Sequence, residues 1–267
     1  MDIGKLSGSF LNSLECRLDV GYGPRIPYNI LCSDMPTIVF ASPKGGAGKS
    51  TSAVLLATQL AGHGAAVTLI DADPNHPLSR WAELPGKPDN LTVIADVTEN
   101  SIIATIETQG RKTPFVIVDL EGTASMMVAY AISRADLVII PVQGSYLDAA
   151  EAVKATKLVQ AQELAFERTI PHRVLFTRTS AAIRTRTFQS IEGQFEAKET
   201  PMFETQLNER DAYRALFAFG GTLGGLDATQ VSNIPAAILN AHNFTREVVD
   251  LVKPKSSAQK TKQEEVA

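Results

Sequence analysis

The stretch "PKGGAGKST", residues 43–51, decides the fold of this chain. The widespread phosphate-binding loop reads Gly-x-x-x-x-Gly-Lys-Ser/Thr, and Gly48, Lys49 and Ser50 match the second half of that pattern. Its first glycine would stand where this chain has Pro43, and a second lysine, Lys44, follows the proline. The stretch is therefore a variant phosphate loop that carries two lysines.

Segments on both sides of the loop have the pattern that a phosphate loop requires. The apolar, β-branched run at 37–41 predicts a buried strand before it, and residues 50–64 predict a helix after it. Backbone N–H groups of the loop and the helix N-terminus would then surround a phosphate. We expect Lys49 to reach the β- and γ-phosphates and the Ser50 hydroxyl to ligate Mg²⁺. The predicted nucleotide-binding residues are Lys44, Gly45, Gly46, Ala47, Gly48, Lys49, Ser50 and Thr51.

Strand and helix patterns alternate along the rest of the chain. Further strands are predicted at 66–71, 91–96, 115–120, 136–142, 172–178 and 201–205, and further helices at 98–109, 125–133, 146–166, 184–197, 208–218 and 232–252. Near-continuous Val, Ile and Leu runs separated by helices are typical of parallel strands buried on both faces. The sequence therefore predicts an α/β fold of the P-loop NTPase type, with a mostly parallel twisted sheet covered by helices on both faces.

The domain organisation follows from where these patterns begin and end. Met35 stands directly before the first predicted strand, so we expect one ATPase domain over residues 35–252. Residues 1–34 form an N-terminal extension of unknown role, and the polar, aperiodic residues 253–267 predict a disordered tail. No apolar run reaches the length of a membrane span, and no secretory signal is evident, so a cytoplasmic location is expected.

Cysteine, histidine and net charge exclude several classes of protein. The chain has two cysteines and four scattered histidines, too few and too dispersed for a zinc or iron–sulfur site. The net charge of −4 argues against a protein that coats DNA constitutively.

Three aspartates stand at or just beyond the ends of predicted strands. Asp119 ends "FVIVD", and Asp71 and Asp73 belong to "LIDADP". Ligand groups gather at the carboxyl ends of parallel strands, so these carboxylates are expected on the same edge of the sheet as Lys49. We predict that Asp119 holds Mg²⁺ directly or through water. The alternative is that each aspartate caps the following helix.

Several motifs together resemble the ParA/MinD ATPases. "KGGAGKS" resembles the family's variant phosphate loop, "LIDADPN" its second motif and "ADLVIIPVQGSYLD" its fifth-strand motif. "NERDAYRALFAFGGTL" is similar to the late helix of the plasmid-partition branch without an N-terminal helix-turn-helix domain. The resemblance spans about residues 35–252.

The resemblance implies why the loop has two lysines. Lys44 matches the family's signature lysine, which reaches the nucleotide held by the other subunit of an ATP-bound homodimer. Lys49 would act within its own chain, Asp73 would position the attacking water, and Asp71 would support the Mg²⁺ shell. Lys44, Lys49 and Asp73 are thus the catalytic candidates, Ser50, Asp71 and Asp119 the metal candidates, and ATP and Mg²⁺ the cofactors.

The chain departs from the family pattern at three places. Asn75 replaces a common glutamine, and Gly144 replaces a common proline. After Asp119 the chain reads Leu120-Glu121-Gly122, where the family often has Thr-Pro-Pro. Glu121 would polarise water, reach the metal shell or pair with an arginine. "DLEG" resembles a branch that includes ATPases of conjugative and T-DNA transfer.

Residues 168–191 carry five arginines and no acidic residue. Such a cluster would bind phosphate backbones without sequence preference, and the family resemblance implies nonspecific DNA binding by the ATP-bound dimer on the nucleoid. The DNA-binding candidates are Arg173, Arg184, Arg186 and Arg214. Arg178, at a strand's carboxyl end, would instead lie near the nucleotide base.

The leading interpretation is a partition ATPase whose slow hydrolysis is stimulated by a ParB-like adaptor, with a plasmid or chromosome locus as cargo. ATPases of DNA transfer or cargo positioning use the same switch, so this alternative stays open. A membrane-cycling regulator like MinD would need an apolar C-terminal anchor, which "KPKSSAQKTKQEEVA" lacks. A metabolic ligase on the same fold is a further alternative.

Overall fold

A computed structural model describes residues 35–122, 125–183 and 185–253. The predicted N-terminal extension, nearly all of the predicted tail and the DNA-binding candidate Arg184 lie outside these ranges.

The described residues form a seven-stranded sheet in the order β3-β2-β4-β1-β5-β6-β7. Its strands are β1 (Thr37–Phe40), β2 (Val67–Ala72), β3 (Leu91–Ile94), β4 (Phe115–Leu120), β5 (Leu137–Gln143), β6 (His172–Thr179) and β7 (Leu207–Asn208). Every pairing is parallel. Nearly every residue of β1, β2, β4 and β5 is buried, as expected where helices cover both faces. The predicted fold class is confirmed.

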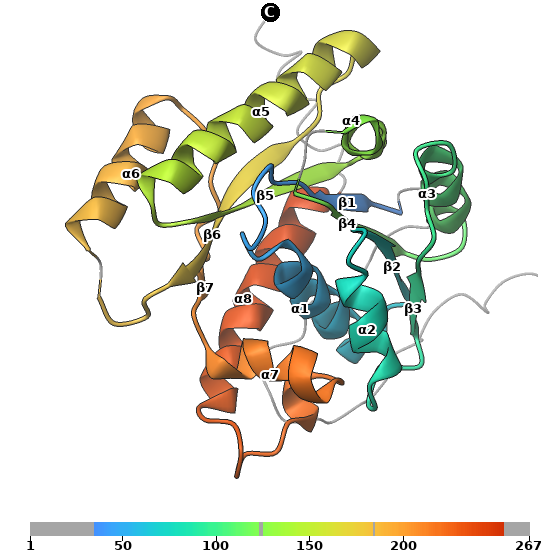
Figure 1. Ribbon diagram of the computed structural model, residues 1–267, viewed down its shortest axis with the longest axis vertical. Coiled ribbons are helices and arrows are strands. Elements are labelled where there is room, and N and C mark those ends of the chain that lie inside the picture. Colours follow the sequence, from blue (N-terminus) through green and yellow to red (C-terminus); the bar gives the residue numbers. More distant parts are fainter. Residues whose placement is uncertain (1–34, 123–124, 184, 254–267) are drawn as a thin grey trace, which may run out of the picture.

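Helices cover the two faces of this sheet (Figure 1). One core contains side chains of α1 (Lys49–Gly62), α2 (Pro77–Glu83), α7 (Asp211–Phe219) and α8 (Ile234–Val252). The other contains side chains of α3 (Ile102–Gly110), α4 (Met126–Ser133), α5 (Tyr146–Phe166) and α6 (Arg186–Ala197). Adjacent residues of β1 alternate between the cores: Ile38 and Phe40 pack into the first and Val39 into the second.

Strand order places the phosphate loop where the chain changes direction across the sheet. β1 lies between β4 and β5. The strands β2, β3 and β4 lie on one side of it in the sheet, and β5, β6 and β7 lie on the other. Ligands bind parallel α/β sheets at such a switch point, outside the carboxyl ends of the strands. The loop after β1 and the loops after β2 and β4 open on this edge.

Two elements differ from the sequence prediction. The predicted strand at 201–205 was wrong: Met202 makes only an isolated bridge to Val174, and β7 is Leu207–Asn208. The N–H groups of Glu204 and Thr205 donate to the Glu247 carboxylate of α8, at 2.8 and 2.9 Å, so this segment turns away from the sheet. Helix α2 was not predicted. Among the described helices, none is both long and apolar enough to cross a membrane.

Candidate nucleotide site

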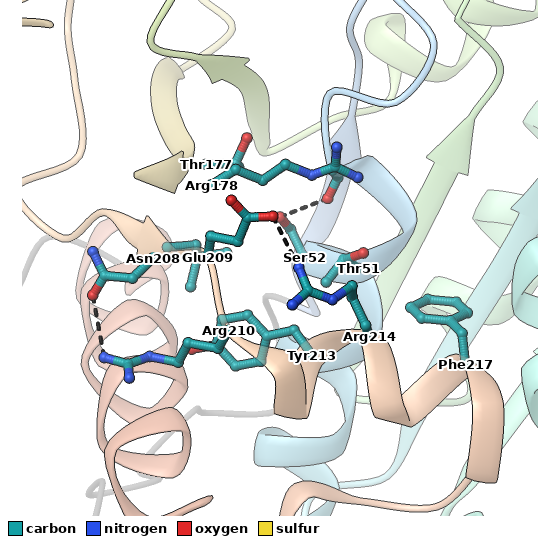
Figure 2. Close-up of a pocket in the computed structure, with 12 residues that line it drawn as sticks. Thr51, Ser52, Thr177, Arg178, Asn208, Glu209, Arg210, Tyr213, Arg214 and Phe217 are labelled. Atoms are coloured by element: carbon teal, nitrogen blue, oxygen red, sulfur yellow. Dashed lines mark hydrogen bonds and ion pairs between the residues drawn. The ribbon is translucent and has the colours of Figure 1, made fainter. Parts of the chain in front are cut away.

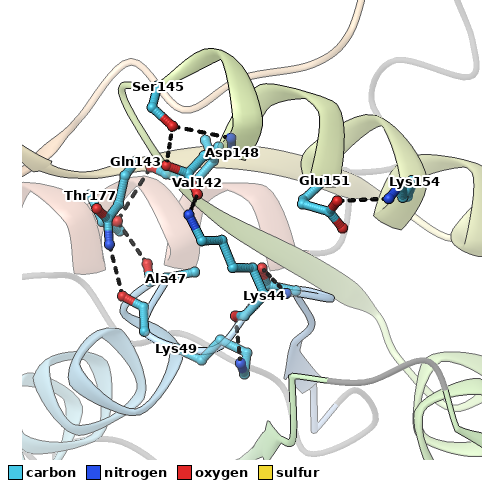
Figure 3. Close-up of polar contacts among 12 residues, drawn as sticks. Lys44, Ala47, Lys49, Val142, Gln143, Ser145, Asp148, Glu151, Lys154 and Thr177 are labelled. Atoms are coloured by element: carbon cyan, nitrogen blue, oxygen red, sulfur yellow. Dashed lines mark hydrogen bonds and ion pairs between the residues drawn. The ribbon is translucent and has the colours of Figure 1, made fainter.

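The phosphate loop lies between β1 and α1 and is held from the sheet side. Gly46 and Gly48 have φ angles of 77° and 96°, which glycine adopts without steric cost. Gln143 Nε2 donates to the Gly46 carbonyl at 2.9 Å, and Thr177 Oγ1 donates to the Ala47 carbonyl at 2.7 Å (Figure 3). These contacts engage the loop's carbonyl oxygens and not its N–H groups, and the N–H groups of the first turn of α1 can also bind an anion.

Lys49, the first residue of α1, lies inside this site. Its side chain is buried, and Nζ lies 3.4 Å from the Lys44 carbonyl oxygen. Burial lowers the pKa of Lys49, while Asp119, Asp73 and Glu121 oppose that shift. The structure thus brings Lys49 together with two of the three predicted aspartates, Asp119 and Asp73, and with Glu121. This concentration of charge matches a site for Mg²⁺ and phosphate.

Lys44 extends in a different direction, toward α5. Its Nζ lies 2.5 Å from Asp148 Oδ1, while Ser145 Oγ donates to Asp148 Oδ2 at 2.5 Å (Figure 3). Ser145 also caps α5, accepting from the Asp148 N–H. Asp148 is buried, whereas the Lys44 side chain is 43% exposed. The second lysine is therefore held within its own chain by a fixed carboxylate.

Asp71 and Asp119 lie side by side on β2 and β4, as register partners. Asp71 Oδ2 accepts from the N–H and the hydroxyl of Ser79, both at 2.8 Å. Asp71 Oδ1 and both oxygens of Asp119 are buried, and none accepts a well-formed hydrogen bond from a described residue. Burial raises the pKa of Asp119 to about 7, against the effects of the Ser50 hydroxyl and Lys49.

These buried oxygens fit a divalent cation. A buried carboxylate without a partner is costly, and Mg²⁺ beside Ser50 would remove that cost. In the described part of the chain, no group of three or more His, Cys, Asp or Glu side chains is arranged to hold a metal alone. Mg²⁺ beside a nucleotide is usually held by one or two protein groups together with water and phosphate oxygens.

Asp73 stands at the beginning of the loop after β2, half-buried. Its Oδ1 accepts from the N–H and the side-chain amide of Asn75, at 2.8 and 3.0 Å. Asn75, a departure from the family pattern, thus orients the carboxylate predicted to position water.

The turn after β4 packs directly on the phosphate loop. A Cβ atom added at Gly122 would lie 2.8 Å from the Gly45 nitrogen and 3.0 Å from the Lys44 carbonyl carbon. The turn can approach so closely only because residue 122 has no side chain. Glu121 therefore belongs to the edge of the site, close enough to affect the pKa of Lys49.

A cavity of about 340 Å³ continues from the phosphate loop toward α7 (Figure 2). Gly48, Thr51 and Thr177 line one side, and Asn208, Arg210 and Phe217 line the other. Sequence reasoning did not identify this cavity. The loop after β6, the short β7 and α7 form it by packing, and none of them carries a recognisable nucleotide motif.

The structure does not gather the DNA-binding candidates that it describes into one patch. Arg173, near the start of β6, donates to the Met202 carbonyl at 2.9 Å. Arg214 pairs with Glu209 at 2.9 Å and with Asp211 at 3.6 Å. Arg186 is exposed at the beginning of α6, beyond the opposite end of β6 from Arg173.

Known proteins with similar sequences and folds include partition-type ATPases. A family model described as VirC1 protein matches residues 35–261. Protein ParA from Rhizobium radiobacter is 47% identical over 210 residues, covering 79% of this chain and 94% of the relative. Protein virC1 from Rhizobium rhizogenes is 30% identical over 189 residues, covering 68% and 80%. An ATP complex of a Cyanothece McdA variant has a TM-score of 0.63 at 19% identity, covering 78% of this chain and 96% of that one. This last similarity concerns the fold alone.

Proposed function

Since the chain belongs to the VirC1 family of ParA/MinD-type partition ATPases, we propose that it is an ATP-dependent switch that carries DNA. ATP closes a homodimer, the dimer binds double-stranded DNA without sequence preference, and a ParB-like partner stimulates slow hydrolysis to ADP and phosphate. The cargo is a plasmid or chromosome region, and the protein works on the nucleoid. Residues 35–252 form the ATPase domain. The family model matches residues 35–261, so its first residue supports the N-terminal boundary of the domain.

One observation carries the proposal: the two lysines of a single loop reach different surroundings. Lys49 is buried beside the carboxylates, whereas Lys44 is half-exposed and paired with Asp148. A lysine that served only its own phosphate site would be expected to lie beside Lys49. This arrangement supports a role for Lys44 in the nucleotide site of a second subunit, where its charge stabilises phosphate oxygens during transfer.

The other predicted metal-binding, catalytic and phosphate-binding residues have roles in the same reaction. Ser50 and Asp119 would hold Mg²⁺, with Asp71 fixed by Ser79 in support, and the bound ion would supply positive charge to the phosphates. Asp73, oriented by Asn75, positions the attacking water. Residues 44–51 bind the phosphates. The McdA variant was solved as a complex with ATP, which supports a nucleotide ligand for this fold.

The DNA-binding surface is proposed to include Arg186, together with Arg173, Arg184 and Arg214. Arg186 supports this assignment best, because it is exposed at the beginning of α6. The intramolecular contacts of Arg173 and Arg214 would have to be exchanged for phosphate contacts.

Molar mass by light scattering tests the dimer switch. We expect a monomer with ADP or no nucleotide and a dimer with ATP and Mg²⁺. Lys44→Ala should still bind ADP but remain monomeric with ATP, and Lys49→Ala should bind neither nucleotide well. Lys154→Ala, in an exposed pair with Glu151, is the control that dimerises normally. The same mass in every nucleotide state, or a Lys44→Ala dimer, would contradict the proposal.

A second candidate function is an ATPase of DNA transfer that uses the same switch. The Leu120-Glu121-Gly122 turn favours it, because that stretch resembles a branch that includes ATPases of conjugative and T-DNA transfer. Identifying the DNA-bound partner separates the two: an adaptor at a partition locus supports segregation, and a component of a transfer complex supports transfer.

A further inference from the structure

We propose that Arg178 is a nucleotide-binding residue whose guanidinium contacts the α-phosphate, the part of the nucleotide that ATP and ADP share. This inference rests on the proposed function and adds a residue outside the phosphate loop. It follows from the backbone conformation of Arg178, from the contacts of its neighbours and from the cavity that its side chain enters.

The backbone at Arg178 is unfavourable for an arginine. Its φ angle is 51°, in the left-handed region that residues with a Cβ rarely adopt. Among the described non-glycine residues with positive φ, Arg178 is the one that lies inside a strand; the others are His76, Asp96, Glu167, Glu199 and Asn233. Strained residues of this kind persist where the surroundings fix them, and they cluster at functional sites.

A bulge in the sheet explains how this conformation is held. The pairing of β6 with β7 shifts register between Thr177 and Thr179, which leaves Arg178 as the inserted residue. Thr177 donates to the Ala47 carbonyl of the phosphate loop at 2.7 Å, and Thr179 Oγ1 accepts from Asn208 Nδ2 at 2.9 Å. Both threonines are buried, whereas Arg178 is exposed. Bulges beside active sites commonly redirect a side chain in this way.

The redirected side chain enters the nucleotide cavity. Arg178 lines the 340 Å³ cavity together with Gly48 and Thr51. Figure 2 shows it extending from the end of β6 toward the beginning of α1. A nucleotide whose β- and γ-phosphates lie at Lys49 would pass Gly48 and Thr51 before its sugar and base reach α7. The α-phosphate is the group that would meet Arg178.

The guanidinium is also available for such a contact. Two other arginines line the cavity: Arg214 pairs with Glu209, and Arg210 donates to Asn208 Oδ1 at 3.3 Å. Within the described residues, Arg178 has no side-chain hydrogen bond or ion pair, so it would lose none on binding. A guanidinium matches phosphate oxygens in shape and charge, often through two parallel hydrogen bonds.

Calorimetric titration of the full chain with Mg²⁺-ATP and Mg²⁺-ADP tests this assignment. Arg178→Gly removes the guanidinium and fits the left-handed backbone, so the variant should fold with an unchanged or higher melting temperature. We expect Kd to rise about ten-fold for ATP and for ADP alike, as for the loss of a charged hydrogen bond. Arg111→Ala, at the exposed end of α3, is the matched control and should bind as wild type.

The outcomes separate this inference from the proposed function. Unchanged Kd values in a folded Arg178→Gly variant would overturn the role of Arg178 alone. A loss restricted to ATP would overturn the α-phosphate assignment, because it would place the contact at the γ-phosphate. A wild-type chain that bound neither nucleotide would overturn the proposed function and this inference with it.

Discussion

Lys44 Nζ lies 2.5 Å from Asp148 Oδ1, in an ion pair that joins the phosphate loop to the first turn of α5. The carboxylate is buried and is oriented by the Ser145 hydroxyl, so this lysine has a fixed position when no partner subunit is present. If Lys44 serves the nucleotide of a second chain, the pair must open for the dimer to form. In that case the pair would oppose dimerisation and affect the monomer's nucleotide affinity little.

Asp148→Asn should make dimerisation easier. The substitution keeps the shape of the side chain and one acceptor oxygen for the Ser145 hydroxyl, but it removes the charge that holds Lys44. We expect the ATP-dependent dimer to form at about three- to ten-fold lower protein concentration, corresponding to about 1 kcal/mol in total for the two partly exposed pairs that open in one dimer. Analytical ultracentrifugation over a concentration series measures this. Glu151→Gln, in the exposed pair with Lys154 (Figure 3), is the control, and an equal shift in both variants would refute the explanation.

Gly122→Ala should damage the phosphate loop. The added methyl group would lie 2.8 Å from the Gly45 nitrogen, so either the turn or the loop must move. We expect the free energy of unfolding to fall by about 1–3 kcal/mol and nucleotide affinity to fall with it. Urea unfolding and nucleotide titration measure the two effects. Gly193→Ala, where the new methyl group meets nothing within 4 Å in α6, should be neutral or slightly stabilising. Wild-type affinity in Gly122→Ala would show that the close contact is unimportant.

Stability should depend on pH through two histidines, His63 and His242, that have no part in the proposed nucleotide site. His63, after α1, and His242, in α8, have ring centroids 5.5 Å apart, and His242 Nε2 is buried without a partner among the described residues. Burial lowers the pKa of both, and a second charge adds to it: His242 acts on His63, and Arg246 acts on His242. Below the ordinary histidine pKa of about 6.5, the unfolded chain binds more protons than the folded one. The stability that the two uncharged histidines contribute is therefore fully present above about pH 6.5. It is lost as the pH falls from that value toward the lower pKa values of the folded state.

Unfolding by urea at pH 7, 6 and 5 tests whether stability falls as the pH is lowered. The free energy of unfolding should fall less steeply with acidification in the double variant His63→Gln, His242→Gln than in the wild type. His172→Gln, a histidine substitution on β6, serves as the control. An identical slope in the double variant and the wild type would show that the pair does not govern acid sensitivity.

Local spacing was enough to predict the fold class and the strand and helix on either side of residues 43–48. A strand, a glycine turn and a helix beginning at Lys49 are adjacent in sequence, and aspartates at strand ends reach one edge of any parallel sheet. Asp71 and Asp119 accordingly lie as register partners. Helix α2 escaped prediction because Pro74, Pro77 and Pro85 suggest turns, although proline is well suited to the first turn of a helix.

Contacts between distant segments could not be predicted in this way. Lys44 and Asp148 are separated by 104 positions, and nothing local indicates that α5 begins over the phosphate loop. The segment at 201–205 has a strand-like composition, yet Glu247 of α8 binds its N–H groups. The cavity beside Arg178 likewise depends on how β7 and α7 pack against α1. In each case tertiary contacts decide the outcome.

Binding to arbitrary duplex DNA at low salt tests the central claim most directly. The wild type should bind with ATP and Mg²⁺ but not with ADP or without nucleotide, and added salt should weaken the complex. Lys44→Ala and Lys49→Ala should both lose the ATP-dependent binding. Equal binding in every nucleotide state, or none in any, would contradict the account of an ATP-gated dimer that carries DNA.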